Sequence, residues 1–435
     1  MMDFDLALVR PRWDNSGVSY PLGLMYIQAY CKRLGFTVRL FDELYEPLEL
    51  FWRLVEAGEV SVVGISMLSR LREGGYDIVR KVKKLDPGVK VVLGGIHASS
   101  LPKLLVDNLP VDAAVIGEGE VTMRELLDLW VHHIGTIQDV RGIATREYGL
   151  HASRALVQDL DRLPFPDMSD INPANFKPPI AQLKPNFTIN GVTLGQSVSA
   201  NMITSRGCLG RCLFCNAWQH WAGKVRFRSA KNVVDEILDR QLNYGVNMIE
   251  FHDDCLAQNR QIMVDICQRI LDDHIRVAWY SAIRPDVVDL ELLHIMHDAG
   301  CFMLAYGVES GSQFVLDNID KRTTKRDIAN AIELTKKAGI KAYALLMVGN
   351  LGETDATIDE TVRFMNEVKP DLHSAIGKVW VYPDTAYARL MGIQDKFWLS
   401  GNEMPFFQQG FSLDDCDRWR ARIDAEVPKP WLQET

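Results

Sequence analysis

The sequence predicts an α/β protein with two domains, a doubly wound parallel sheet followed by a partial TIM-like barrel of six β/α units. The chain of 435 residues is longer than a single hydrophobic core ordinarily supports. Short apolar runs alternate with amphipathic stretches twice, first in residues 3–135 and again in residues 199–390. This alternation is typical of parallel strands covered by helices, and a Pro-rich stretch separates the two series.

The first series contains five apolar runs that read as strands, separated by stretches with helical periodicity. The predicted strands are 4–10, 37–42, 60–67, 90–95 and 112–120, and the predicted helices are 22–35, 76–85, 101–108 and 122–130. A flavodoxin-like sheet is the expected product. Ligands of such sheets bind at the carboxyl ends of the strands, so the candidate ligand loops are 10–23, 66–70, 94–100 and 117–120.

The second series contains six further strand–helix units. The predicted strands are 200–206, 248–253, 276–282, 302–310, 341–349 and 373–381, and the helices lie at about 231–242, 260–272, 289–299, 325–338 and 356–367. A complete TIM barrel has eight such units, so six units predict a partial barrel that is open on one side.

The domain boundaries follow from these two series. We expect a first domain over 1–135, a linker over 136–198, the partial barrel over 199–390 and a C-terminal cap over 391–435. The linker includes a small hairpin around Gly149. The cap is rich in aromatic residues, which are expected to form a hydrophobic plug at the open side of the barrel.

Charge and hydropathy argue against several classes of function. The net charge is −9 with no basic stripe, which argues against a nucleic-acid partner. No apolar run approaches the ~18 residues of a membrane helix. Acidic residues stand near the start of the sequence where a secretion signal would carry Lys or Arg, so we expect a cytoplasmic location. Eight cysteines in such a chain do not suggest a disulfide framework.

Three of the cysteines, Cys208, Cys212 and Cys215, lie within eight positions of one another. Gly207 and Gly210 make this stretch a loop, which favours metal binding over simple packing. Zinc in a closed structural site needs four ligands, and His220 is a candidate for the fourth. A 4Fe–4S cluster normally takes four cysteines, so three would leave one iron open to a small molecule. The spacing favours an iron–sulfur cluster and leaves zinc as the alternative.

The C-x3-C-x2-C spacing after a first strand, followed by six β/α units, resembles the radical S-adenosylmethionine (SAM) enzymes. The preceding domain resembles the cobalamin-binding domain of their cobalamin-dependent branch, on the stretches 20–35, 62–67, 91–99 and 115–120. The resemblance implies a 4Fe–4S cluster held by the three cysteines, with SAM chelated at the fourth iron. Reduction would then cleave SAM to methionine and a 5′-deoxyadenosyl radical.

The resemblance also implies contacts to SAM at the carboxyl ends of the barrel strands. Phe214 stands where the family places an aromatic residue near the adenine. The other expected cofactor contacts are Asp253, Arg284, Glu309, Ser310, Gly349 and Gly352, the last two in a "GNLGET" stretch where Asn350 and Leu351 depart from the family's "GLPGET". Tyr382 and Asp254 are the candidates for a catalytic or substrate-facing role. For each acid or Arg, a structural ion pair is the alternative.

Many cobalamin proteins carry D-x-H-x-x-G, whose His ligates cobalt, and this sequence has no such motif. The resemblance therefore implies a cobalt without a His ligand from this domain. Backbone N–H groups at the loop ends would hold the corrin. The expected contacts are Ser66, Leu68, Gly95, His97, Gly117 and Glu118.

These expectations support three functions. The first is a cobalamin-dependent radical SAM enzyme that methylates an unactivated carbon of a small metabolite. The second uses the same cofactors for a cyclisation or rearrangement without methyl transfer. The third is a zinc-stabilised, non-catalytic binding protein. Under the first two, the partners are a small-molecule substrate and an electron donor such as flavodoxin or ferredoxin, with no nucleic acid and no membrane.

Overall fold

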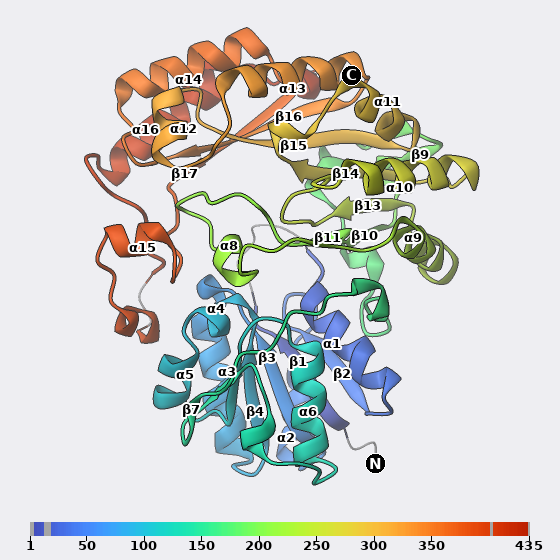
Figure 1. Ribbon diagram of the computed structural model, residues 1–435, viewed down its shortest axis with the longest axis vertical. Coiled ribbons are helices and arrows are strands. Elements are labelled where there is room, and N and C mark those ends of the chain that lie inside the picture. The colour runs from blue at the N-terminus through green and yellow to red at the C-terminus, as the bar shows by residue number, and fades with distance from the viewer. Residues whose placement is uncertain (1–3, 13–18, 401–402, 434–435) are drawn as a thin grey trace. The chain divides into compact units, whose positions relative to one another are not determined.

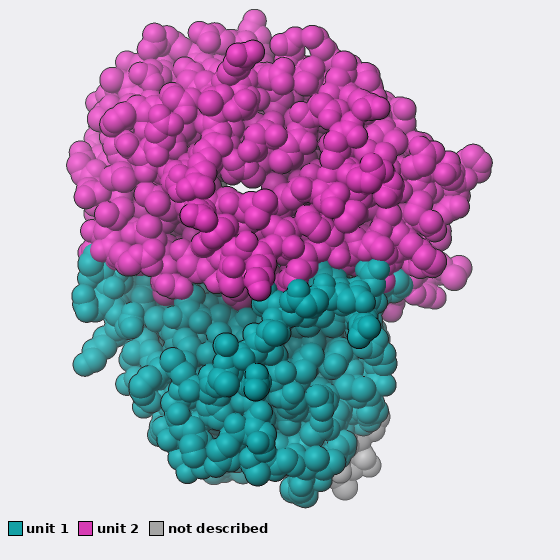
Figure 2. Space-filling view, viewed as in Figure 1, with its two compact units in different colours: residues 1–175, 392–404 teal, residues 176–391, 405–435 magenta. Residues whose placement is uncertain are grey.

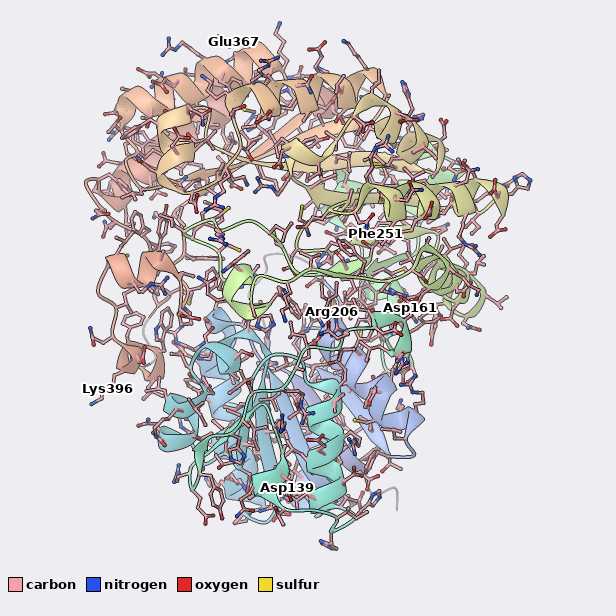
Figure 3. All side chains as sticks on the ribbon, viewed as in Figure 1. Asp139, Asp161, Arg206, Phe251, Glu367 and Lys396 are labelled. Carbon is pink, nitrogen blue, oxygen red and sulfur yellow. The ribbon has the colours of Figure 1, made fainter. Side chains whose placement is uncertain are left out.

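The computed structural model describes residues 4–12, 19–400 and 403–433, and residues 13–18 of the first candidate ligand loop lie outside this range. The chain forms two compact units (Figure 2). Unit 1 comprises 1–175 and 392–404, and unit 2 comprises 176–391 and 405–435. Within the described ranges, no helix has the length and apolar character needed to cross a membrane.

Unit 1 is built on a seven-stranded sheet with the order β2-β1-β3-β4-β5-β6-β7. Its strands are β1 (Phe4–Arg10), β2 (Val38–Asp42), β3 (Val60–Ser66), β4 (Lys90–Gly94), β5 (Ala113–Val115), β6 (Ile143–Thr145) and β7 (Gly149–Leu150). The first five strands pair in parallel and β6 and β7 pair antiparallel. The 2-1-3-4-5 order is that of flavodoxin-like sheets, so the predicted fold of this unit is confirmed.

Helices cover both faces of this sheet (Figure 1). They are α1 (Leu22–Arg33), α2 (Glu49–Glu56), α3 (Arg72–Leu85), α4 (Gly95–Ser100), α5 (Pro102–Asn108) and α6 (Glu120–Trp130). Helix α2 was not predicted. It buries Phe51 and Val55 against the core and exposes its other face, and its two turns are too short for a clear periodic signal.

Unit 2 contains a six-stranded parallel sheet with the order β10-β13-β14-β15-β16-β17. These strands are β10 (Ser199–Met202), β13 (Met248–Phe251), β14 (Ala278–Ile283), β15 (Cys301–Glu309), β16 (Lys341–Val348) and β17 (Leu372–Gly377). The intervening helices are α9 (Ala230–Tyr244), α10 (Arg260–Asp272), α11 (Leu290–Asp298), α12 (Gln313–Asn318), α13 (Lys325–Lys337) and α14 (Asp355–Val368). The predicted partial barrel is confirmed.

The two faces of this curved sheet have different surroundings. Phe251 and Trp279 contact each other edge-on, and the indole N–H of Trp279 reaches the carbonyl of Ala299 after α11, so this face packs under the helices. Met248 and Tyr280 belong instead to an apolar cluster with residues 180–194 and α17 (Pro430–Gln433), on the inner face. Figure 2 shows an opening into unit 2 on the face viewed.

The segments predicted as linker and cap are divided between the units. Residues 143–150 form the predicted hairpin as β6 and β7, which extend the first sheet, whereas α7 (Pro179–Leu183), β8 (Thr188–Ile189) and β9 (Val192–Thr193) belong to unit 2. Residues 395–399 return to unit 1, where Trp398 joins the core. Helix α16 (Leu413–Glu426) packs on the edge strand β17 and on α14.

Candidate active site

The three cysteines lie on the loop that connects β11 (Ser205–Arg206) to α8 (Ala217–His220). Two backbone N–H groups point at their sulfurs, Gly210 N to Cys208 Sγ at 3.3 Å and Ala217 N to Cys215 Sγ at 3.5 Å. The neighbouring Cys255 side chain lowers the pKa of Cys208, whereas burial raises the pKa of Cys215 to about 11. Backbone donors of this kind stabilise thiolates bound to a metal or a cluster.

Gly210 stands where two of these sulfurs converge. A Cβ at this position would lie 3.3 Å from Cys208 Sγ and 3.9 Å from Cys212 Sγ, so it would crowd the first sulfur and touch the second. In the described part of the chain, no three His, Cys, Asp or Glu side chains meet closely enough to hold a single metal ion. An iron–sulfur cluster is wider than one ion, so its cysteines need not meet at one point. The donor set of the loop, three thiols, is that of a cluster with three protein ligands.

Two adjacent carboxylates after β13 hold the start of the cysteine loop. Asp253 is buried and accepts hydrogen bonds from the backbone and hydroxyl of Thr204 and from the Ser205 hydroxyl. Asp254 accepts the N–H of Gly207 at 3.0 Å. The sequence predicted a cofactor contact for Asp253 and a catalytic role for Asp254. In the structure both side chains position the backbone that leads into Cys208.

Arg284 follows β14 and lies beside the cysteine loop. Its guanidinium pairs with Asp286 and donates to the carbonyls of Lys321 and Arg322 and to the Thr323 hydroxyl. Its Nη1 lies 3.3 Å from the position of a Cβ on Gly210. Arg284 therefore ties the end of β14 to the segment 321–323 and places positive charge close to the sulfurs.

Glu309 ends β15 and forms a buried ion pair with Lys321, with Nζ and Oε1 2.7 Å apart. Burial alone would lower the pKa of Lys321, but Glu309 and Cys212 together raise it, so the ammonium stays charged. Gly307 leaves the room for this pair, since a Cβ there would lie 2.7 Å from both charged atoms. Sequence reasoning missed Lys321, which has no motif of its own.

The remaining predicted contacts in this region differ in exposure. Ser310 is fully buried, and its hydroxyl lies 3.2 Å from the Thr361 hydroxyl on α14. Phe214 is half-buried on the cysteine loop. Tyr382 is half-buried, and its carbonyl accepts from Thr385, which caps α15 (Ala386–Leu390). Ser310 is thus placed for packing between β15 and α14, whereas Phe214 and Tyr382 are only partly buried.

The "GNLGET" stretch forms a turn around a buried carboxylate. Glu353 Oε2 accepts the N–H groups of Gly349 at 2.6 Å and Asn350 at 2.9 Å. Gly349 and Gly352 have φ angles of 95° and 83°, in the left-handed region that glycine adopts at least cost. Asn350 donates to the carbonyl of Met347 and so stabilises the same turn from within. The glycines therefore shape the turn, and the turn forms with Asn350 and Leu351 at the two positions that depart from the family pattern.

Glu353 provides a pH-dependent test of this turn. Burial raises the pKa of its carboxyl from 4.5 to about 7. The hydrogen bonds from the N–H groups of Asn350 and Gly349 lower the pKa, but by less than burial raises it. Because the folded-state pKa lies above the unfolded one, the stability that this group contributes is present below about pH 4.5 and lost as the pH rises through about 7. Between pH 5 and pH 8 we expect wild type to lose unfolding free energy relative to Glu353→Gln, by on the order of 3 kcal/mol.

The measurement is the midpoint of urea unfolding of both proteins across that pH range. A constant difference between the two proteins from pH 5 to pH 8 would contradict the assignment.

The inner face of the barrel carries a polar cluster. Glu250 on β13 accepts from Asn201 Nδ2 at 3.0 Å and pairs with His252 Nε2 at 2.9 Å. Burial lowers the pKa of His252, but Glu250 more than offsets it, so the net shift is upward. The His252 side chain is 36% exposed. Across the sheet, Tyr343 donates to Ser374 on the same face. This wall offers hydrogen-bonding groups beside apolar surface.

Unit 1 has a cavity of about 170 Å³ at the carboxyl ends of its strands. It is lined by Arg10 at the end of β1, by residues 19–24, by 66–68 after β3, and by Leu71 and Gly95. This is the switch point between β1 and β3, where flavodoxin-like sheets bind ligands. Three of the predicted contacts, Ser66, Leu68 and Gly95, line it. A Cβ on Gly95 would lie 2.8 Å from Ser66 Oγ, so the loops pack closely there.

The other three predicted contacts of unit 1 lie outside this cavity's lining. His97 is fully buried, and burial lowers its pKa to about 3. Its Nε2 lies 2.7 Å from the Tyr76 hydroxyl and its Nδ1 2.9 Å from Ser69 Oγ. Gly117 donates its N–H to Ser99, and Glu118 accepts the N–H of Val157. His97 and Glu118 therefore connect segments of unit 1.

Comparisons with known proteins agree with this architecture. The family model described as the radical SAM superfamily matches residues 202–365, and the model described as the B12 binding domain matches residues 16–127. An uncharacterized methyltransferase of Pyrococcus horikoshii is 28% identical over 81% of this chain and 74% of its own. Cytidylyl-2-hydroxyethylphosphonate methyltransferase of Streptomyces wedmorensis is 27% identical over 78% of this chain and 70% of its own.

Two further similarities extend the comparison. The anaerobic magnesium-protoporphyrin IX monomethyl ester cyclase of Rubrivivax gelatinosus is 26% identical over 87% of this chain and 69% of its own. Among solved structures, the radical SAM methyltransferase TsrM of Kitasatospora setae matches with a TM-score of 0.73 and 16% identity, over 89% and 77% of the two chains. The cobalamin-dependent SAM radical enzyme OxsB matches with a TM-score of 0.78 and 17% identity, over 96% of this chain and 66% of its own. These structures share the fold.

Proposed function

Because the chain belongs to the radical SAM enzymes that carry a B12-binding domain, we propose that it methylates a carbon atom of a small metabolite. Its cofactors are a 4Fe–4S cluster, SAM and cobalamin. When bound, these groups supply the electron that cleaves SAM to methionine and a 5′-deoxyadenosyl radical, and the methyl group that is transferred. The observation that carries the proposal is the loop with three cysteines at the mouth of a six-stranded barrel.

The chain's own residues would hold these groups in place. Cys208, Cys212 and Cys215 would ligate the cluster, and the N–H groups on two of the sulfurs would stabilise the bound thiolates. The guanidinium of Arg284 and the ammonium of Lys321 lie close to these sulfurs and would offset their negative charge. The role proposed for Asp253 and Asp254 is to position the loop rather than to contact SAM.

The loops that line the cavity of unit 1, which include Ser66, Leu68 and Gly95, are the proposed corrin contacts. His97 is not a candidate ligand for cobalt. The Tyr76 hydroxyl donates to the carbonyl of Trp398, so His97 Nε2 must donate to that hydroxyl and its Nδ1 must accept from Ser69. Both ring nitrogens are therefore occupied inside the core, and a ligand role would require this network to open.

Labelling the histidine nitrogens tests this assignment. We expect the EPR spectrum of Co(II) cobalamin bound to the protein to be the same when all histidines carry ¹⁵N as when they carry ¹⁴N. A change in the splitting of the cobalt lines upon labelling would show a histidine on cobalt, and its loss in His97→Gln would identify the residue.

The inner wall of the barrel indicates the kind of substrate. Glu250 and His252 offer hydrogen bonds on one side, and half-buried Tyr343, Leu345 and Met347 provide apolar surface on the other. A molecule with both a polar group and a hydrocarbon portion fits such a wall. The substrate class proposed is therefore a small amphipathic metabolite.

Product analysis tests the function without knowledge of the substrate. Anaerobic holoenzyme with reduced cobalamin and isotopically labelled SAM should form about one S-adenosylhomocysteine per bound cobalamin, as the methyl group moves to cobalt. With reductant it should also release 5′-deoxyadenosine. Formation of 5′-deoxyadenosine alone would reject methyl transfer. That result would favour the second candidate, a cyclisation or rearrangement, which is motivated by the similarity to the cyclase of Rubrivivax gelatinosus.

A further inference from the structure

The segment after β13 reaches back to the cysteine loop through the side chain of Gln258. Its Nε2 donates to the carbonyl of Gly207 at 2.9 Å, and its Oε1 accepts the N–H of Leu209 at 3.0 Å. Nε2 also donates to the carbonyl of Cys255 in its own segment, at 3.1 Å. Both polar atoms of the amide are therefore bonded to backbone, and two of the three bonds lie on either side of the proposed cluster ligand Cys208.

This set of bonds needs a side-chain amide. The carbonyls of Gly207 and Cys255 require N–H donors, and the N–H of Leu209 requires an acceptor. The amide of Gln258 offers a donor and an acceptor side by side. Among side chains of similar length, an ionised glutamate accepts but does not donate, and methionine forms neither kind of strong hydrogen bond. The chemistry of the contact is therefore specific to glutamine at this position.

The backbone just before Gln258 is held in an uncommon conformation. Ala257 is buried and has a φ angle of 58°, in the left-handed region that residues with a Cβ rarely adopt. Such a conformation costs free energy and persists where surrounding contacts impose it. Because Ala257 directly precedes Gln258, the strained position belongs to the turn that presents the amide to the cysteine loop. This strain supports a positioning role independently of the hydrogen bonds.

The sulfur of Cys208 accepts a backbone N–H from the same stretch, with Gly210 N 3.3 Å from Cys208 Sγ. The donor and the acceptor lie two residues apart, so this bond depends on the path of the backbone between them. Gln258 fixes that path before the cysteine, at the Gly207 carbonyl, and after it, at the Leu209 N–H. A side chain 50 residues later in the sequence thus orients the N–H that points at the sulfur.

We propose that Gln258 is a positioning residue of the iron–sulfur site, which holds the backbone around Cys208 so that the Gly210 N–H donates to this ligand and raises the reduction potential of the cluster. The inference rests on the proposed function, which implies the cluster. Hydrogen bonds to the ligating sulfurs help to set the potential, and they favour the reduced cluster because reduction adds negative charge. Gln258 acts through backbone groups, so the open coordination position remains available to SAM.

The first measurement is hydrogen exchange in the full-length protein before the cluster is loaded. Gln258→Met keeps a side chain of similar length and removes all three bonds. The amides of Leu209 and Gly210, resolved by mass spectrometry with electron-transfer fragmentation, should exchange about fivefold to tenfold faster than in wild type, as loss of a typical hydrogen bond predicts. Unchanged exchange at both amides would overturn the proposal. This measurement needs no iron, so it decides even if the variant loads the cluster poorly.

The second measurement is a potentiometric titration of the reconstituted protein, followed by EPR of the reduced cluster. In Gln258→Met the midpoint potential should fall, so that the ratio of oxidised to reduced cluster at the wild-type midpoint rises about threefold to tenfold, the upper end corresponding to about 59 mV for a one-electron couple. Iron content should stay near that of wild type, because all three cysteines remain. A role in general stability alone would lower the thermal midpoint and leave the potential unchanged.

Gln241→Met is the matched control. Gln241 lies on α9 and donates from Nε2 to the carbonyl of Arg276 at 2.8 Å, so this change also removes a bond from a glutamine to the backbone of another segment. It should leave the exchange at 209–210 and the potential unchanged. Equal midpoints for wild type and Gln258→Met, or an equal fall in the control, would overturn the proposal. Absence of iron from reconstituted wild type would instead refute the proposed function.

Discussion

Replacing Cys212 with alanine is expected to abolish binding of the cluster and cleavage of SAM while leaving the fold intact. Cys212 is half-buried on a loop and contributes little to either hydrophobic core. A cluster with only two protein ligands loses one of its three anchors. Removing even a residue that merely supports a metal ligand costs about 10–100-fold, so loss of a ligand should reduce 5′-deoxyadenosine formation more than about 100-fold.

The measurements are the iron and sulfide content, the visible absorption of the reconstituted protein and the midpoint of its thermal unfolding. Cys31→Ala, a change at a buried cysteine of α1 in unit 1, is the control and should retain iron and activity. Full iron content together with normal SAM cleavage in Cys212→Ala would show that the three cysteines are not the ligands.

Replacing Gly207 with alanine is expected to displace the whole cysteine loop. Gly207 has a φ angle of 114°, and a Cβ there would lie 2.1 Å from the carbonyl oxygen of Lys224. Because that oxygen belongs to the backbone, no rotation of a side chain can relieve the overlap. Gly207 immediately precedes Cys208, and its N–H donates to the Asp254 carboxylate. The change should also break this hydrogen bond. We expect iron content to fall by more than half and the protein to lose about 1–3 kcal/mol of stability or more.

Gly245→Ala separates strain from steric overlap. Gly245 ends α9 with a φ angle of 68°, and nothing lies within 4 Å of the position of a Cβ there. Its alanine variant carries the backbone strain alone and should keep normal iron content. The account would fail if Gly207→Ala bound as much iron as Gly245→Ala, because the loop would then tolerate the displacement.

The strands could be predicted well from the sequence because buried parallel strands are continuous apolar runs. Strands β1, β13 and β16 begin and end within a few residues of the predicted ranges. Helix α2 was missed because two turns give too little periodicity. The end of β17 was predicted at 381 but lies at Gly377. Residues 379–381 instead pair with 405–407, a contact across 25 residues that no local pattern reveals.

The site was predictable only where a motif is local. The three cysteines occur within eight positions, so their spacing alone indicates a shared loop. Gln258 binds that loop and Lys321 acts on Cys212 from later segments, and only the folded chain brings them there. The roles expected for Asp253 and His97 came from the family resemblance, and the structure shows both side chains occupied by neighbouring backbone or hydroxyl groups.

The most direct measurement of the central claim is EPR spectroscopy of the anaerobically reconstituted, reduced protein with and without SAM, together with metal analysis. The account predicts about four irons per chain and a signal that changes when SAM binds, because one iron is open to its amino and carboxylate groups. A protein that contains one zinc and no iron, or a cluster signal that SAM leaves unchanged, would contradict it.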